Sequence, residues 1–262
     1  MERIDYLKSY YENYDENSRL ERRRGQVEFL TTVHYIEQYL KEGMKILEIG
    51  AGTGRYSHFF ARNGYKVDAV ELIEHNIEIF KANTKDGENI NIKQGDAVDL
   101  KNIKDYEYDI TLLLGPMYHI YTDQERKAAV SEAIRVTKKG GIIFAAYVNN
   151  DMTVYQFCFS QGNIFNERYK QLIDFDTYKL SSTPEEVFAL YRKSDVDELM
   201  SEFNVKRLHY VGTDVLTRFI ADAIDTMDDS TFEEYMRYHL CICERPDMIG
   251  TTNHMLDIFR KD

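Results

Sequence analysis

The feature that most constrains this chain is a glycine loop that joins a short apolar run, residues 46–49, to a helical pattern. Its three glycines fall at alternate positions, Gly50, Gly52 and Gly54. Glycines between a buried strand and a helix let the backbone itself approach a ligand. A loop that cradles the pyrophosphate of a dinucleotide needs a further glycine where this chain has Arg55. The loop therefore predicts a ligand site in an α/β fold and argues against a dinucleotide.

Four further strand patterns follow the loop. The first two end in the carboxylates Glu71 and Asp96, and the third ends after Leu114, where Gly115 and Pro116 stop a strand because proline lacks a backbone donor. Helical patterns alternate with strands, which indicates parallel pairing with right-handed crossovers. Since ligands of such sheets lie outside the carboxyl ends of the strands, we expect these side chains to meet the glycine loop in one pocket. The strand patterns cover residues 66–71, 90–97, 109–114 and 141–147, and two of the helical patterns cover residues 56–63 and 123–138.

The glycine loop and the strand ends resemble the cofactor-binding motifs of class I S-adenosylmethionine-dependent methyltransferases. The resemblance implies a doubly wound, mostly parallel α/β sheet of seven strands, a Rossmann-like fold, with a helical cap. It also implies that Glu71 accepts hydrogen bonds from the ribose hydroxyls, which suits an acceptor-only carboxylate, and that Asp96 faces the adenine amino group. S-adenosyl-L-methionine is then the expected cofactor, and no metal is expected. The residues expected to bind the cofactor are Glu48, Gly50, Ala51, Gly52, Gly54, Glu71, Leu72, Asp96, Ala97 and Leu114.

The segment after the fourth strand, residues 115–119, is where the family places residues near the transferred methyl group. Tyr118 and His119 are therefore the catalytic candidates. His119 could act as a general base because the ordinary pKa of histidine lies near working pH; the alternative is a structural histidine that hydrogen-bonds a neighbouring strand. Methyl transfer from a sulfonium needs no strong base, since positioning and exclusion of water supply much of the acceleration. The Asn/Asp-Pro-Pro-Tyr/Phe sequence of members that methylate base amino groups or glutamine is missing here, which argues against DNA adenine methylation.

The patterns divide the chain into four parts. Residues 1–43 hold an arm, a lid candidate, and an amphipathic helix. Residues 44–148 form the cofactor-binding core, and the aromatic-rich residues 149–193 are interpreted as a cap over the pocket. Residues 194–262 return to the core with a helix that has Ser194 as its N-cap. The remaining expected elements are a sixth strand at residues 204–211, two helices between residues 214 and 246, and a seventh strand at residues 253–260.

Composition narrows the class of partner. The formal net charge of the 262 residues is −12, which disfavours nonspecific attraction to nucleic acid or to an anionic membrane. The three cysteines include no C-x-x-C pair, so we expect neither a disulfide framework nor a structural zinc site, and a reducing cytoplasm is the expected location. Nor does any apolar run reach the roughly 18 residues of a membrane span.

These observations predict a methyltransferase that acts on a small-molecule acceptor by in-line displacement. One alternative is an enzyme that modifies RNA or protein, with a basic stripe beside the pocket. Another is a regulatory protein that binds S-adenosylmethionine without turnover. The acceptor and the oligomeric state stay open. The residues available for a basic stripe are Arg22, Arg23, Arg24, Arg168 and Lys170.

Overall fold

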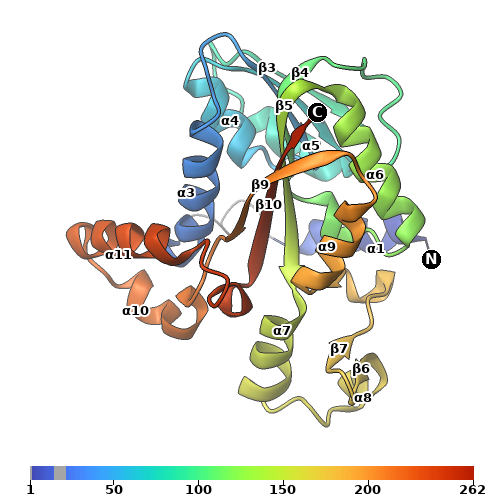
Figure 1. Ribbon diagram of the computed structural model, residues 1–262, viewed down its shortest axis with the longest axis vertical. Helices are drawn as coiled ribbons and strands as arrows, with labels where there is room; N and C mark the ends of the chain where they lie inside the picture. The colour runs from blue at the N-terminus through green and yellow to red at the C-terminus, as the bar shows by residue number, and fades with distance from the viewer. Residues whose placement is uncertain (1, 15–21) are drawn as a thin grey trace.

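A mixed β-sheet forms the centre of the molecule (Figure 1). The structure is a computed structural model and describes residues 2–14 and 22–262. The strand order is β3-β2-β1-β4-β5-β10-β9, with β10 antiparallel to both of its neighbours and the other pairs along this path parallel. A short strand, β8 (Leu190–Tyr191), pairs with the end of β5 outside this path. The expected doubly wound, mostly parallel sheet of seven strands is confirmed, with β8 as an addition. Its strands are β1 (Lys45–Ile49), β2 (Lys66–Glu71), β3 (Ile90–Gln94), β4 (Tyr108–Leu113), β5 (Thr137–Asn149), β9 (Val205–Gly212) and β10 (His254–Lys261).

Helices cover both faces of the sheet because the central strands are apolar on both sides. In β4, Ile110 and Leu112 pack toward α3 and α4, while Leu113 packs toward α6 and α9. In Figure 1, α3 and α4 lie on one side of the sheet and α6 on the other. The bounds of these helices are α3 (Arg23–Glu37), α4 (Arg55–Arg62), α6 (Asp123–Val136) and α9 (Lys193–Ser201).

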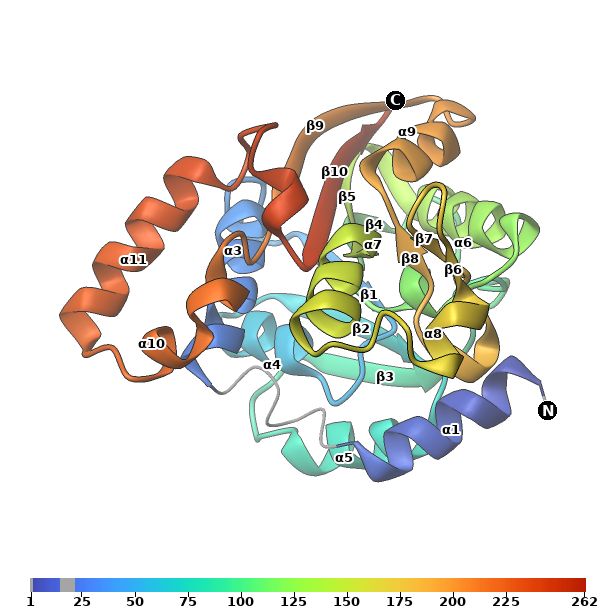
Figure 2. The same ribbon diagram turned by 90° about the horizontal axis from the view of Figure 1, so that it is seen from below.

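Further helices lie at the edges of this core. Figure 2 shows α1 beside α5, along the edge strand β3, and α10 with α11 at the opposite end of the molecule. Across the described ranges, no helix has a long enough apolar stretch to cross a bilayer. The two helices expected between residues 214 and 246 are present as α10 and α11. The bounds are α1 (Arg3–Asn13), α5 (Glu74–Asn83), α10 (Ala221–Asp225) and α11 (Asp229–Ile242).

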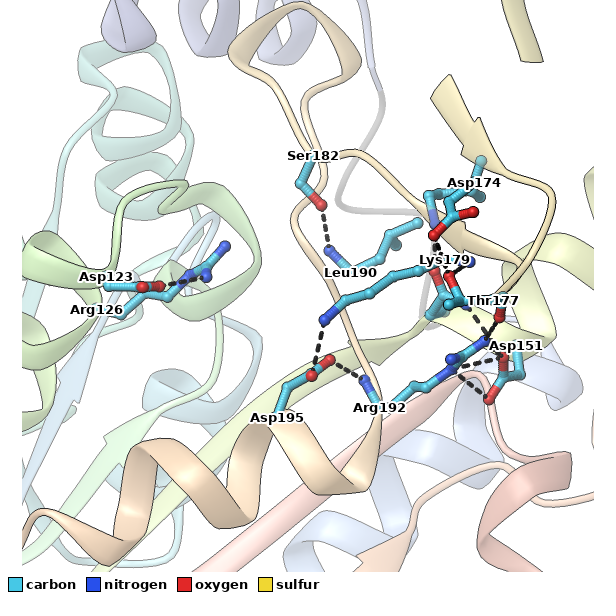
Figure 3. A network of polar contacts seen from close by, with 12 residues as sticks. Asp123, Arg126, Asp151, Asp174, Thr177, Lys179, Ser182, Leu190, Arg192 and Asp195 are labelled. Carbon is cyan, nitrogen blue, oxygen red and sulfur yellow. Dashed lines mark hydrogen bonds and ion pairs between the residues drawn. The ribbon is translucent and has the colours of Figure 1, made fainter. Parts of the chain in front are cut away.

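The chain between β5 and α9 projects from the end of the sheet (Figure 1). It holds α7 (Asn150–Thr153), a π-helical segment (Val154–Ser160), α8 (Glu167–Leu172) and a two-stranded hairpin of β6 (Ile173–Asp174) and β7 (Lys179–Leu180). Polar contacts fasten the hairpin to the core (Figure 3). The Arg192 guanidinium donates to Asp151 at 2.9 Å and to the Thr177 carbonyl at 2.7 Å, and the Lys179 ammonium lies 2.8 Å from the Asp195 carboxylate. We call residues 150–191 the cap segment.

Two local expectations are wrong at element boundaries. Ser194 is not an N-cap: α9 begins at Lys193, because the Asp195 carboxylate accepts a hydrogen bond from the backbone N–H of Arg192 at 2.8 Å. The strand expected at residues 141–147 begins earlier, because residues 138–141 already belong to β5; there the register against β4 shifts and Gly140 adopts a φ of +75°. Neither boundary changes the order of the elements.

Candidate active site

The glycine loop lies at the carboxyl end of β1 and packs against the segment that follows β4. The N–H of Gly50 donates to the Val70 carbonyl at 2.8 Å. Gly50 has a φ of +75°, and a Cβ atom at this position would lie 2.5 Å from Cδ of Pro116. A side chain is therefore excluded by both backbone conformation and space. Gly54 has a φ of +92° and serves as the N-cap of α4.

A pocket of about 100 Å³ opens at this loop, at the carboxyl ends of β1, β2 and β4. Nine of the ten residues expected to bind the cofactor line this first pocket, and so do Tyr118 and His119. The exception is Gly54, which faces His58 and Phe80 instead. The nine lining residues are Glu48, Gly50, Ala51, Gly52, Glu71, Leu72, Asp96, Ala97 and Leu114.

Glu71 is held rigidly at the end of β2. Its carboxylate accepts the backbone N–H of Gly52 at 2.8 Å and that of Ile73 at 2.9 Å. Burial raises the pKa of Glu71, and these backbone donors act against that rise because they stabilise the charged form. The first contact joins the end of β2 to the glycine loop, so the carboxylate is oriented before any ligand arrives.

Glu48 is the most deeply buried carboxyl group of the first pocket, with 2% of the residue exposed. The Ser57 hydroxyl donates a hydrogen bond to it. Burial raises the pKa of Glu48 to about 8, and the nearby Glu71 charge adds to the rise. Glu48 is therefore mostly protonated at neutral pH.

His119 lies in a 3₁₀ turn, Pro116–His119, that directly follows β4. Its Nδ1 lies 2.8 Å from the Val187 carbonyl, and its Nε2 lies 2.8 Å from the Tyr11 hydroxyl. Burial lowers the pKa of His119 to about 4, which makes it a weak base at neutral pH and favours the alternative of a structural histidine over that of a general base. The Tyr118 hydroxyl donates to the Leu114 carbonyl at 2.8 Å, and this hydrogen bond stabilises the same turn.

Helix α1 contributes three residues to the first pocket that the sequence reasoning missed. They are Arg3, Leu7 and Tyr11, spaced four residues apart and therefore on one face of the helix. Arg3 forms an ion pair with Asp96, and Leu7 is buried. The spacing of four residues was the available signal, whereas the sequence analysis predicts for this segment only an arm that is a lid candidate.

A second cavity of about 540 Å³ adjoins the first pocket, and both are lined by Tyr11 and Tyr118. Its aromatic lining comes from α1, the β4 turn and the cap segment. No described residue of the cap segment lines the first pocket, so the expectation that the cap covers that pocket is corrected: it lines the second cavity. The aromatic residues of this cavity are Tyr10, Tyr11, Tyr14, Tyr118, Phe157 and Phe188.

A histidine between two carboxylates forms the far wall of the second cavity. Nδ1 of His254 lies 3.3 Å from Asp214 and 3.3 Å from Glu28. Asp214 also accepts the backbone N–H of Asn253 at 2.7 Å and the Thr252 hydroxyl at 2.7 Å. Burial raises the pKa of Asp214, but the hydrogen bond with His254, the Arg218 guanidinium and the Thr252 hydroxyl together hold it well below its usual range.

The candidate basic stripe is largely neutralised by local ion pairs. Arg24 contacts Asp225 at 2.6 Å. Arg168 pairs with Glu186, and Lys170 pairs with Glu167. Arg23 contacts Asp229 at 2.5 Å. These arginines of α3 fasten it to α10 and α11, which favours a structural role over contact with a polyanion.

Part of the chain is similar to known methyltransferases. Residues 46–141 match the family described as "Methyltransferase domain". The chain is 28% identical over 117 residues to the ubiquinone biosynthesis O-methyltransferase of Pelagibacter ubique, covering 44% of this chain and 47% of the relative. It is 29% identical over 128 residues to the demethylmenaquinone methyltransferase of Staphylococcus saprophyticus, covering 47% and 53%. The chain thus spans about half the length of the curated relatives it matches.

Solved structures share the fold over nearly the whole chain. A protein of Pyrococcus horikoshii superposes with a TM-score of 0.64 at 15% identity, covering 97% of this chain and 99% of that one. A SAM-dependent methyltransferase of Methanosarcina mazei superposes with a TM-score of 0.57 at 16% identity, covering 87% and 96%. Residues 46–141 thus match a methyltransferase domain, and the strand order of the whole chain agrees with the fold of the solved S-adenosylmethionine-dependent methyltransferase.

Proposed function

We propose that this protein transfers a methyl group from S-adenosylmethionine, bound in the first pocket, to a small-molecule acceptor bound in the second cavity. The observation that carries the proposal is the shared wall of the two spaces. Tyr11 and Tyr118 line both, at the point where the glycine loop and the turn after β4 meet. Two ligands placed there would meet at this wall, as a direct transfer requires.

The residues of the first pocket fit an adenosyl cofactor. The backbone of Gly50 and Gly52 allows close approach, and Glu71 is oriented for a ribose diol. Asp96 lines the same pocket, which supports the contact with the adenine amino group that the resemblance implies. The pocket encloses only about 100 Å³, whereas ligand pockets typically measure about 300–1,000 Å³. Arg3 and Leu7 of α1 lie in this space, so we propose that α1 shifts outward when the cofactor binds.

The chain's own contribution to the reaction is positioning and exclusion of water. S-adenosylmethionine, when bound, supplies a methyl group activated by a positively charged sulfur. The aromatic side chains of the second cavity offer faces that stabilise a cation, and α1, which lines both spaces, limits the access of water. These effects act without a strong base, in agreement with the low pKa of His119.

A small-molecule acceptor fits the structure better than a macromolecule. The net charge is −12, and Arg23, Arg24, Arg168 and Lys170 are already paired with carboxylates. The matched relatives are named as a ubiquinone biosynthesis O-methyltransferase and a demethylmenaquinone methyltransferase, and both quinones are small molecules. The cytoplasmic location stays a prediction, and it is compatible with the free thiols of the three cysteines.

Calorimetry with S-adenosylhomocysteine tests the cofactor half of the proposal. Glu71→Gln keeps the shape of the side chain but removes the charge, so the affinity should fall about ten- to hundredfold, the worth of a hydrogen bond to a charged group. Glu74→Gln is the matched control, because Glu74 is exposed in the first turn of α5 and does not line the pocket. Equal affinity in wild type and Glu71→Gln would remove Glu71 from the ribose role.

Turnover separates an enzyme from a regulatory protein that only binds the cofactor. Wild type is incubated with S-adenosylmethionine carrying a tritiated methyl group and with small amines, phenols, alcohols and thiols. The proposal expects transfer to one of these classes. Binding of S-adenosylhomocysteine without transfer to any class would favour the regulatory reading.

A further inference from the structure

The lining of the second cavity contains cationic side chains that the methyl transfer itself does not use. Among its described residues are three arginines, Arg22, Arg24 and Arg218, and two residues with carboxylates, Glu28 and Asp214. With histidine taken as neutral, the formal charge of this described lining is therefore positive, although the net charge of the chain is −12. An excess of positive charge in a hollow raises the local concentration of anions.

Arg218 is better placed than Arg24 to bind a ligand of this cavity. The Nε of Arg24 donates to Asp225 at 2.6 Å, and one of its Nη atoms donates to Asp222 at 3.0 Å. The Nε of Arg218 lies 3.8 Å from Oδ2 of Asp214, which is an ion pair longer than a hydrogen bond. This pair holds the guanidinium beside Asp214, and its N–H groups can still donate to a second anion.

Asp214 is held by the fold, so it orients Arg218 rather than a ligand. In addition to its contacts with Asn253 and Thr252, it accepts the backbone N–H of His254 at 3.0 Å, and the residue is buried. A carboxylate whose oxygens already accept from protein donors offers little to a cationic ligand. Arg218, by contrast, can be reached from the cavity, because it lines that space and 35% of its side chain is exposed.

The segment that carries Arg218 is held in a strained conformation. Leu216 has a φ of +59°, which a bulky residue rarely adopts. Its backbone N–H donates to the Thr251 carbonyl at 3.3 Å, and the hydroxyl groups of buried Thr217 and of Tyr235 lie 2.9 Å apart. Strained backbone that the surroundings hold in place is typical of binding sites, because it fixes a side chain before the ligand arrives.

The two ends of the second cavity differ in chemistry. Arg218 belongs to the far wall through its ion pair, whereas Tyr11 and Tyr118 form the wall shared with the first pocket. Aromatic side chains line the same space, among them Tyr10 and Phe188, whose ring centroids are 5.6 Å apart. An acceptor held at the far wall by an anionic group would therefore direct the rest of its structure toward the shared wall.

We propose that the acceptor carries a carboxylate on an aromatic body and that Arg218 binds this carboxylate; the proposal rests on the methyl transfer proposed above. A guanidinium matches a carboxylate because two of its N–H groups donate to the two oxygens in parallel. The described lining has one more arginine than carboxylates, which suits a monoanion better than a phosphate dianion. The aromatic body packs against the aromatic walls. Arg218 is a positioning residue, because it orients the acceptor and does not touch the reacting atoms.

Four matched ligands test which charge the cavity selects. They are 3-phenylpropionate, 3-phenylpropanamide, 3-phenylpropylamine and 2-phenylethyl phosphate, each titrated into the protein saturated with S-adenosylhomocysteine and followed by protein NMR. We expect 3-phenylpropionate to bind at least about tenfold more tightly than the other three, the worth of a hydrogen bond to a charged group. Equal affinity for the acid and the amide, tighter binding of the amine or the phosphate, or binding of none of the four would overturn the proposal.

Arg218→Gln tests the contact. We expect the affinity for 3-phenylpropionate to fall about ten- to hundredfold and that for 3-phenylpropanamide to stay within about twofold, because only the acid uses the charge. Arg218→Lys keeps the charge without the planar fork, so its loss should be smaller. Arg237→Gln is the matched control: this exposed arginine of α11 pairs with Glu234 at 3.2 Å and lines neither cavity, so the acid should bind as in wild type. Equal affinities for the acid in Arg218→Gln and Arg237→Gln would refute the assignment.

Methyl transfer tests whether the bound acid is the acceptor. 3-(4-Hydroxyphenyl)propionate and 3-(4-aminophenyl)propionate are each compared with their amides, with S-adenosylmethionine that carries a tritiated methyl group. We expect kcat/KM to be at least about tenfold higher for an acid than for its amide, and Arg218→Gln to remove the difference mainly by raising KM. Equal or faster transfer to the amides, or transfer to neither acid, would contradict the proposal.

Binding of S-adenosylhomocysteine in the same preparations separates this proposal from the proposed function. Its affinity should be the same in wild type and Arg218→Gln, because Arg218 does not line the first pocket, and this result also shows that the variant is folded. If S-adenosylhomocysteine binds and 3-phenylpropionate does not, only the carboxylate contact is contradicted. If wild type fails to bind S-adenosylhomocysteine, the methyl transfer itself is contradicted.

Discussion

Binding of the cofactor is expected to release a proton from Glu48. This carboxyl group lines the first pocket, and burial raises its pKa to about 8 from the ordinary 4.5. At pH 7 it is therefore about 0.9 protonated. The amino-acid part of S-adenosylhomocysteine carries an ammonium group, and a cation beside Glu48 favours its charged form. If that contact returns the pKa to its ordinary range, binding releases about 0.9 proton per molecule at pH 7 and about 0.5 at pH 8.

Calorimetry in two buffers of different ionisation enthalpy measures this number directly, because the difference in observed heat is proportional to the protons released. Glu48→Gln keeps the hydrogen bond with Ser57 feasible and cannot ionise, so its proton release should be near zero. The reasoning is refuted by a wild-type release near zero at pH 7. It is equally refuted by the same release in wild type and variant, which would assign the proton to another group.

Three other expectations concern single side chains. Gly50→Ala should lower the free energy of unfolding, measured by chemical denaturation, by about 2–5 kcal/mol, because the backbone is strained and the new Cβ would lie 2.5 Å from a proline ring. Gly87→Ala is the control: its φ is similar but no atom lies within 4 Å of the new Cβ, so the loss should be about 1–2 kcal/mol. Equal costs would exclude the steric part. Arg3→Gln should raise the affinity for S-adenosylhomocysteine about two- to fivefold, because the ion pair with Asp96 no longer occupies the pocket. In the control Lys8→Gln, at an exposed residue of the same helix, the affinity should not change. Weaker binding in Arg3→Gln would contradict this. Because the pKa of Asp214 is depressed in the folded state, this carboxylate stabilises the fold above about pH 4, and the stabilisation is lost as the pH falls below that value. On acidification, the free energy of unfolding should therefore fall less in Asp214→Asn than in wild type.

The core of the fold was predictable from the sequence because each of its signals is local. Buried parallel strands produce apolar runs, the sharp turn after β1 requires glycine, and Pro116 stops the chain from continuing β4. The boundaries were less predictable. Serine is a common N-cap residue, yet the N-cap of α9 is Arg192 and not Ser194, because the Asp195 carboxylate accepts a hydrogen bond from the backbone N–H of Arg192. Competing caps one or two residues apart are decided by small differences in geometry.

The part of the site formed by α1 could not be predicted, because its partners are remote in sequence. Arg3 meets Asp96 across 93 positions, and Tyr11 meets His119 across 108. A period of four places Leu7 and Tyr11 on one face of a helix, but no local pattern states what that face will touch. The same holds for the cap segment, whose aromatic content indicated a ligand cavity without indicating which one.

The sequence by itself determined the order of strands and helices and the chemical types at the strand ends, since periodicity and glycine spacing depend on near neighbours. Only the tertiary structure decided which of these groups are charged and what they face. Glu48 and His119 have ordinary pKa values in an unfolded chain, and burial beside particular partners shifts the first to about 8 and the second to about 4. The electrostatic character of the site therefore arises from desolvation, which depends on every element packed around it.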